Sequence, residues 1–106
     1  MTWKYKFKYD NDRVYFAHSY PYTFSDLNEY LDYLEKDEMR CQTCHISILA
    51  KTLAGNSCKQ VTVTNRGGYE VVKSRRGVVI SARVHPGETI GSWMMKGVLD
   101  FLTGPS

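Results

Sequence analysis

Residues 77 to 84 form a short, continuous run of apolar and β-branched side chains, Gly-Val-Val-Ile-Ser-Ala-Arg-Val. A run of this kind is typical of a strand that is buried on both faces, as in the parallel sheets of α/β proteins. Such a strand needs further strands beside it and helices over it. Only one helix is predicted after this run, so we expect an α/β chain whose sheet is incomplete at residue 106.

The first predicted helix covers residues 26 to 38, with Ser25 as its N-cap. Asp26 and Glu29 lie in its first turn, where the helix dipole favours negative charge. Apolar side chains three or four residues apart predict one buried stripe. This stripe comprises Leu27, Tyr30, Leu31 and Leu34.

The second predicted helix begins after Ser92, which is a suitable N-cap, and runs to residue 102. Gly104-Pro105 provides the expected stop signal. We expect Met94 and Met95 to face the protein core.

The remaining patterns predict strands and loops. Residues 3 to 9 alternate between aromatic and lysine side chains, and residues 13 to 19 resume a strand-like run, which together predict a β-hairpin. Residues 60 to 64 are rich in β-branched side chains and predict another strand. Residues 46 to 53 are compatible with either a helix or a strand, and residues 66 to 77 predict a loop.

Composition restricts the function classes. The 106 residues suffice for one small domain or part of a larger one. No apolar run approaches the roughly 20 residues of a membrane helix, and no apolar signal-peptide core follows Met1, so we expect a soluble cytoplasmic protein without membrane contact. A net charge of +3 is too small to indicate nucleic-acid binding. The oligomeric state is left open.

His85 and Glu88 are the candidate metal ligands. They directly follow the apolar run, and functional groups in open α/β sheets gather at the carboxyl ends of strands. Imidazole nitrogen and carboxylate oxygen both suit zinc. Pro86 and Gly87 would turn the backbone and aim the two side chains at one point. The alternative is a surface loop in which the His and Glu never meet.

Three stretches of sequence extend this interpretation. They are residues 16 to 27 (Phe-Ala-His-Ser-Tyr-Pro-Tyr-Thr-Phe-Ser-Asp-Leu), residues 51 to 56 (Lys-Thr-Leu-Ala-Gly-Asn), and residues 82 to 89 (Ala-Arg-Val-His-Pro-Gly-Glu-Thr) followed by 92 to 102. In this order they resemble the first part of the catalytic domain of the cytosolic carboxypeptidases, the deglutamylating branch of the zinc metallocarboxypeptidases.

The resemblance implies a fold and an activity. It implies that residues 20 to 106 are the front of an incomplete metallocarboxypeptidase-like mixed sheet with flanking helices. It implies that residues 1 to 19 are a short β-hairpin from a preceding β-sandwich. His85 and Glu88 would bind Zn²⁺, and the intact enzyme would remove C-terminal residues, above all glutamates from acidic protein tails such as those of tubulin.

The same resemblance also shows what this chain lacks. In the family, the third zinc ligand is a histidine, and it lies well downstream together with the catalytic glutamate. No histidine follows His85, and no position matches the catalytic base or the groups that bind the substrate carboxylate. We therefore assign no catalytic residue, and we expect the 106-residue chain alone to be inactive.

Rival metal sites involve the cysteines. Cys41-Gln-Thr-Cys44-His45 matches the attachment pattern of c-type haem. The same residues with Cys58 have ligand types suited to structural zinc. The lack of an export signal argues against haem, and the adjacency of Cys44 and His45 argues against zinc. Free thiols in a reducing compartment are the simplest interpretation.

The alternative function uses a basic loop, which we define as residues 66 to 76. Arg66, Lys73, Arg75 and Arg76 give it positive charge that would attract acidic partners. On this hypothesis the chain is a non-catalytic binding remnant. His18 follows an apolar run and is interpreted as structural rather than as a ligand.

Overall fold

Helix α1, Phe24–Lys36, forms where the apolar stripe was predicted. The computed structural model describes residues 2–105. The helix begins two residues earlier than expected, because Thr23 is the N-cap. Its Oγ1 accepts from the Asp26 amide at 3.1 Å, and the Asp26 carboxylate accepts from the Thr23 amide at 2.6 Å. This reciprocal capping box satisfies two amides that the helix cannot pair. The prediction of Ser25 as N-cap is therefore wrong.

Strands β1, Cys44–Lys51, and β2, Ser57–Val63, form an antiparallel hairpin. The predicted strand at 60 to 64 is thus confirmed, and the ambiguous stretch before it is a strand. The chain reverses through a turn in which the Thr52 amide donates to the Asn56 carbonyl at 2.9 Å. Gly55 adopts a φ of 82°, a conformation that glycine reaches without steric cost.

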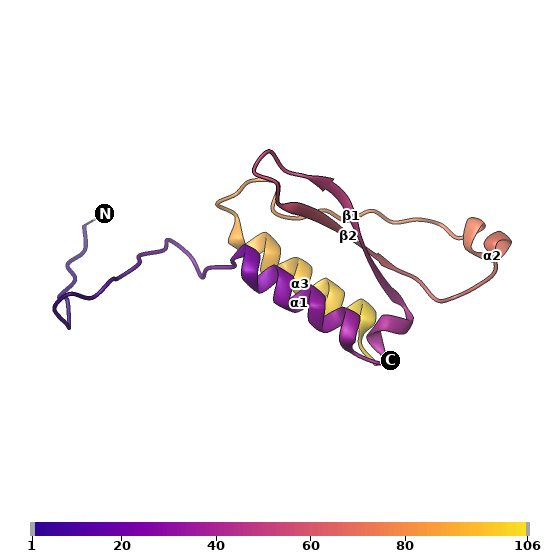
Figure 1. Cartoon of the computed structure of the whole chain (residues 1–106), viewed down its shortest axis with the longest axis horizontal. Coiled ribbons are helices and arrows are strands. Elements are labelled where there is room, and N and C mark those ends of the chain that lie inside the picture. The colour runs from indigo at the N-terminus through magenta and orange to yellow at the C-terminus, as the bar shows by residue number, and fades with distance from the viewer. Residues whose placement is uncertain (1, 106) are drawn as a thin grey trace.

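Helix α3, Thr89–Thr103, lies beside α1 and runs in the same direction, with the β-hairpin over the pair (Figure 1). It stops at Gly104 as predicted, but it begins before Ser92, which is an internal residue. Met95 packs against the core, whereas Met94 is 68% exposed, so the prediction for the two methionines is half right. The buried core comprises Tyr30, Leu31, Leu34, Cys44 and Leu99.

Polar contacts also join α1 to α3 around Asp100. Its carboxylate accepts from Lys96 Nζ at 2.7 Å and from the Tyr30 hydroxyl at 2.9 Å. Arg40, in the 3₁₀ turn Arg40–Gln42, lies 3.4 Å from the same carboxylate and donates to Thr103 Oγ1 at 2.8 Å. Burial opposes ionisation of Asp100, but these hydrogen bonds and positive charges outweigh it and lower its pKa.

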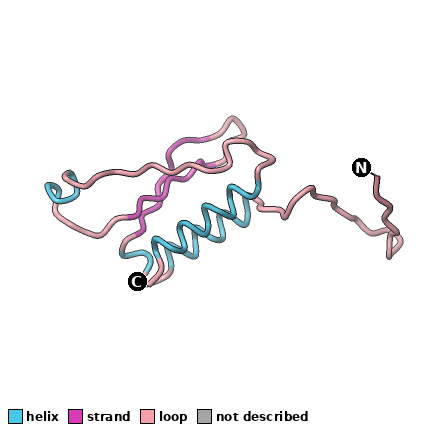
Figure 2. The backbone as a smooth tube through the Cα atoms, turned by 180° about the vertical axis from the view of Figure 1, so that it is seen from behind, coloured by secondary structure: helices cyan, strands magenta, loops and turns pink. Residues whose placement is uncertain are grey.

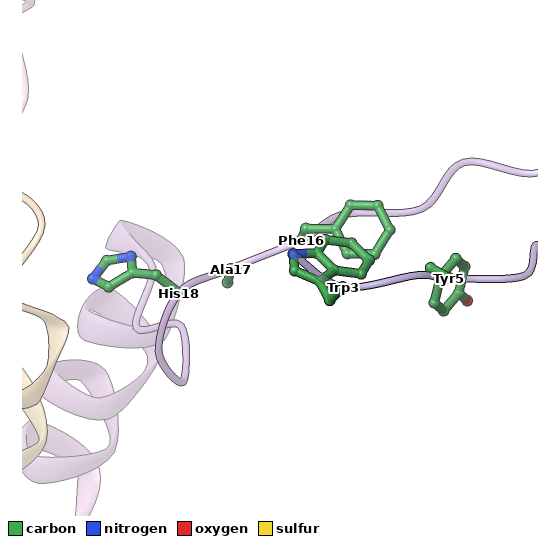
Figure 3. Close-up of a pocket in the computed structure, with 5 residues that line it drawn as sticks. All are labelled: Trp3, Tyr5, Phe16, Ala17 and His18. Carbon is green, nitrogen blue, oxygen red and sulfur yellow. The ribbon is translucent and has the colours of Figure 1, made fainter. Parts of the chain in front are cut away.

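The predicted N-terminal hairpin is not formed among residues 2–22, which contain no strand. The two arms turn back near residues 9 to 11, and their contacts are aromatic: the Trp3 and Phe16 ring centroids are 4.7 Å apart, and those of Tyr5 and Phe16 are 5.2 Å apart. Figure 3 shows Trp3 and Phe16 side by side, with His18 apart from them toward the helices. Side-chain stacking alone does not supply the hydrogen-bonded ladder of a strand pair.

The predicted strand at residues 77 to 84 is also absent. Val78 and Val79 are 83% and 97% exposed, and no strand of the described chain pairs with this segment. An extended segment becomes a strand only through a hydrogen-bonded neighbour. A short helix that was not predicted, α2 (Tyr69–Lys73), lies in the loop before it.

The observed class is therefore mixed α/β, with a two-stranded antiparallel sheet and flanking helices among residues 2–105. Figure 2 shows the N-terminal segment and the α2 region extending from opposite ends of the body formed by α1, α3 and the hairpin. The radius of gyration is accordingly 18.4 Å, against about 13 Å for a compact chain of this length. The division into a domain ending at residue 19 and a second at 20 to 106 stays a prediction. None of the described helices is long and apolar enough to cross a membrane.

Candidate metal site

His85 and Glu88 lie on a single turn that leads directly into α3. The Glu88 amide donates to the His85 carbonyl at 3.1 Å, and the Gly91 amide donates to the Glu88 carbonyl at 3.1 Å. Both side chains are exposed to solvent. The fold therefore places the two candidate ligands on one short, accessible turn, and the convergence of their side chains on one metal ion stays a prediction.

A shallow hollow lies beside this turn. Glu88 and Ile90 line it on one side, and His18 and Ser19 line it on the other. The hydroxyl oxygens of Ser19 and Thr89 are 2.8 Å apart and join the two sides. His18 is exposed and lines this hollow, and its interpretation as structural rather than as a ligand stays a prediction.

The donor types at this turn fit zinc, but the set is partial. A catalytic zinc site uses three protein ligands and leaves one position for water. Among residues 2–105, no three His, Cys, Asp or Glu side chains gather closely enough to hold a metal ion. His85 and Glu88 therefore make up at most part of the ligand set that a catalytic zinc site needs, and their role as ligands stays a prediction.

Arg83 is the residue at this site that the sequence interpretation did not identify. Its guanidinium donates to the Pro86 carbonyl, in the middle of the candidate turn. The sequence feature that could have identified Arg83 is its position as the one charged residue in the run from 77 to 84, two positions before His85.

The cysteines do not gather into the rival zinc site among the described residues. Cys44 is buried in the core, and burial raises the pKa of its thiol, whereas Cys41 and Cys58 are exposed. Cys44 pairs with Val63 and Cys58 pairs with Ala50, so these two cysteines occupy opposite ends of the hairpin. Seven strand residues separate these ends by roughly 20 Å, which is too far for a shared zinc ion. All three are free thiols, as expected.

The basic loop surrounds α2 and is braced against the residues that directly follow β2. Arg75 Nη1 donates to Thr64 Oγ1 at 2.6 Å and to the Asn65 carbonyl. Arg66 and Arg76 are exposed. Arg75 thus shapes the loop, while Arg66 and Arg76 present their charge outward.

Comparison with known proteins identifies relatives along the whole chain. Cytosolic carboxypeptidase 3 of Bos taurus is 42% identical over 106 residues, which cover 100% of this chain. Cytosolic carboxypeptidase 2 is 47% identical over 103 residues in Danio rerio and 44% identical over 107 residues in Homo sapiens. The matched region spans 11%, 14% and 12% of these three relatives, respectively. No family model and no solved structure matches the chain.

Proposed function

We propose that this chain, which is homologous from end to end to one stretch of the cytosolic carboxypeptidases, supplies two zinc ligands, His85 and Glu88, to a metallocarboxypeptidase. The observation that carries the proposal is the exposed turn before α3, which joins the two residues by a backbone hydrogen bond. A third ligand and the catalytic base come from other parts of the intact enzyme. When bound, zinc lowers the pKa of a water ligand and polarises the scissile carbonyl.

The proposed reaction is removal of C-terminal residues, chiefly glutamates, from acidic protein tails such as those of tubulin, in the cytoplasm. The family resemblance of the three sequence stretches supports acidic substrates. Residues 2–105 provide no complete ligand set. The role of this chain is therefore to supply part of the metal site, at the turn before α3.

Zinc affinity of the full 106-residue chain tests the ligands. We expect His85→Ala and Glu88→Ala each to weaken binding of Zn²⁺, measured by competition with a chromophoric chelator. His45→Ala is the matched control, because His45 is also exposed but lies on β1. Equal affinity of the His85→Ala variant and the unmodified chain would refute the assignment. Release of glutamate from a polyglutamylated peptide by this chain would contradict the need for further residues.

The alternative function, acidic-partner binding by the basic loop, is favoured by one observation. Arg66 and Arg76 are exposed on a segment that extends away from the helices (Figure 1). Arg76→Ala is the cleaner test, because Arg75 also braces the loop. If the chain acts only by binding, Arg76→Ala weakens capture of a polyglutamate peptide and His85→Ala leaves it unchanged.

A further inference from the structure

We propose that Arg83 is a positioning residue that holds the turn carrying His85 and Glu88 in place against the two helices. The effect of Arg83 on metal binding rests on the function proposed above. The effect of Arg83 on the position of the turn is independent of that function. Arg83 itself is not a ligand in this proposal, since a guanidinium carries no lone pair available to a metal.

The first argument is the contact with the turn. Arg83 Nε and Nη2 both donate to the Pro86 carbonyl, at 3.1 Å and 2.9 Å. Pro86 lies between the two candidate ligands, so this carbonyl is at the centre of the turn. Hydrogen bonds from a charged donor are stronger than neutral ones, and two donors on one acceptor also restrict its orientation.

The second argument is the opposite side of the guanidinium, which contacts the protein body. Nη1 donates to the carbonyl of Tyr22 and lies 3.5 Å from Ser92 Oγ on α3. Tyr22 is buried, and its ring meets that of Trp93 edge-on at 4.8 Å. One side chain therefore connects the exposed turn to the packed contact between the start of α1 and α3.

The third argument is the backbone of Arg83, which has a φ of 55°. This left-handed conformation is unfavourable for a side chain other than glycine, and it persists when the surroundings impose it. Helix α3 lies close enough to impose this conformation, since a Cβ on Gly91 would lie 3.1 Å from the Arg83 backbone nitrogen. The lack of a side chain at Gly91 thus lets the Arg83 backbone lie directly against the helix.

Arg83→Lys is the informative substitution. Lysine keeps the positive charge but has a single ammonium group, which cannot reproduce the planar fork that reaches Pro86 and Tyr22 together. Trypsin cleaves after either residue, so cleavage after position 83 remains a valid readout in both proteins. Cleavage after Arg76, in the exposed loop, is the internal reference within each digest.

We expect Arg83→Lys to raise cleavage after position 83, relative to position 76, by about tenfold, because proteolysis reports the population of the opened segment. Digests in denaturant correct for the intrinsic preference of trypsin. An unchanged corrected ratio would overturn the proposal. If trypsin also cleaves the Arg83→Lys variant after Lys36 in α1, that variant has unfolded globally. A second variant then tests whether Arg83 holds the turn.

That second variant is Gly91→Ala, which keeps the guanidinium but crowds the Arg83 backbone. We expect it to raise the cleavage ratio about threefold, although alanine favours helix formation more than glycine and would by itself protect α3. A ratio that stays constant or falls would overturn the proposal.

Zinc titration then separates the two proposals. If His85 binds zinc, Arg83→Lys should weaken the affinity about tenfold, a typical loss for a residue that orients a ligand. Equal zinc affinities of Arg83→Lys and the unmodified chain would overturn the metal-related part of the Arg83 proposal and leave the ligands intact. If His85→Ala leaves zinc affinity unchanged, the proposed function fails, and the cleavage ratio still decides the role of Arg83 in the turn.

Discussion

The hairpin β1–β2 and the segment at residues 77 to 84 share one strand-favouring feature but have different surroundings. Both are rich in β-branched side chains. The hairpin pairs two strands joined by a short turn and buries Cys44 against α1 and α3. The later segment pairs with no described strand and exposes Val78 and Val79.

This difference shows that, of two segments rich in β-branched residues, the one that has a neighbouring strand to pair with forms a strand. An antiparallel pair needs only a short turn to bring its partner alongside, whereas a parallel neighbour needs a crossover of a dozen or more residues. The helices follow the same logic, since α1 and α3 each present an apolar stripe to the other and to the hairpin. The predictions below test this contrast between the packed body and the exposed segments.

The largest expected effect is on the packed body. Leu34 is 0% exposed, so Leu34→Ala removes contacts and leaves a cavity in a very small core. We expect it to lower the free energy of unfolding by about 3 kcal/mol, measured by urea denaturation followed by circular dichroism. The matched substitution Leu53→Ala, at a fully exposed position in the hairpin turn, should change it by less than about 0.5 kcal/mol. Equal losses at the two positions would contradict the core as described.

A second prediction concerns the exposed segment. Unpaired, apolar extended backbone is a template for pairing with another chain, so we expect the 106-residue chain to self-associate. Val79→Lys should weaken self-association about fivefold, measured by sedimentation, because it replaces a 97% exposed apolar side chain by a charged one.

Ser81→Lys is the control for that experiment. It adds the same charge to the same exposed segment without removing an apolar side chain. A smaller effect of Ser81→Lys than of Val79→Lys attributes self-association to the apolar surface. An unmodified chain that sediments as a monomer at every concentration tested would refute the prediction altogether.

The sequence predicted those features that depend on nearby residues. The α1 stripe, β2 and the stop of α3 at Gly104 follow from periodicity, β-branching and a helix terminator. The N-cap was misassigned because a capping box depends on a reciprocal pair, Thr23 and Asp26, rather than on a single residue. The strand at 77 to 84 was misassigned because its pattern does not reveal whether a partner is present.

For the candidate site, the sequence located both candidate ligands on one turn but missed Arg83, whose side chain donates hydrogen bonds to that turn. His85 and Glu88 are three positions apart, so their shared turn is a local property. The contact between Arg83 and the Tyr22 carbonyl joins residues 61 positions apart, and it depends on how α1 and α3 pack. Contacts at that separation follow from the tertiary fold and leave no periodic signal.

The smallest expected effect distinguishes polar from apolar stabilisation of the packed body. Hydrogen bonds from Lys96 and Tyr30, together with the positive charges, hold the pKa of Asp100 below its usual value despite the opposing effect of burial. A carboxyl whose pKa is lower in the folded state stabilises the fold above its unfolded pKa, about 3.9, and loses that contribution as pH falls through the folded value.

Asp100→Asn should therefore lower the free energy of unfolding by about 0.5–1 kcal/mol at pH 7, since the side chain is 37% exposed and screened by solvent. The deficit should shrink below about pH 4, where the unmodified chain also loses the charge. Urea denaturation of both proteins at pH 7 and pH 3 measures this difference in the free energy of unfolding. A difference that is the same at both pH values would show that the carboxylate charge does not stabilise the contact between α1 and α3.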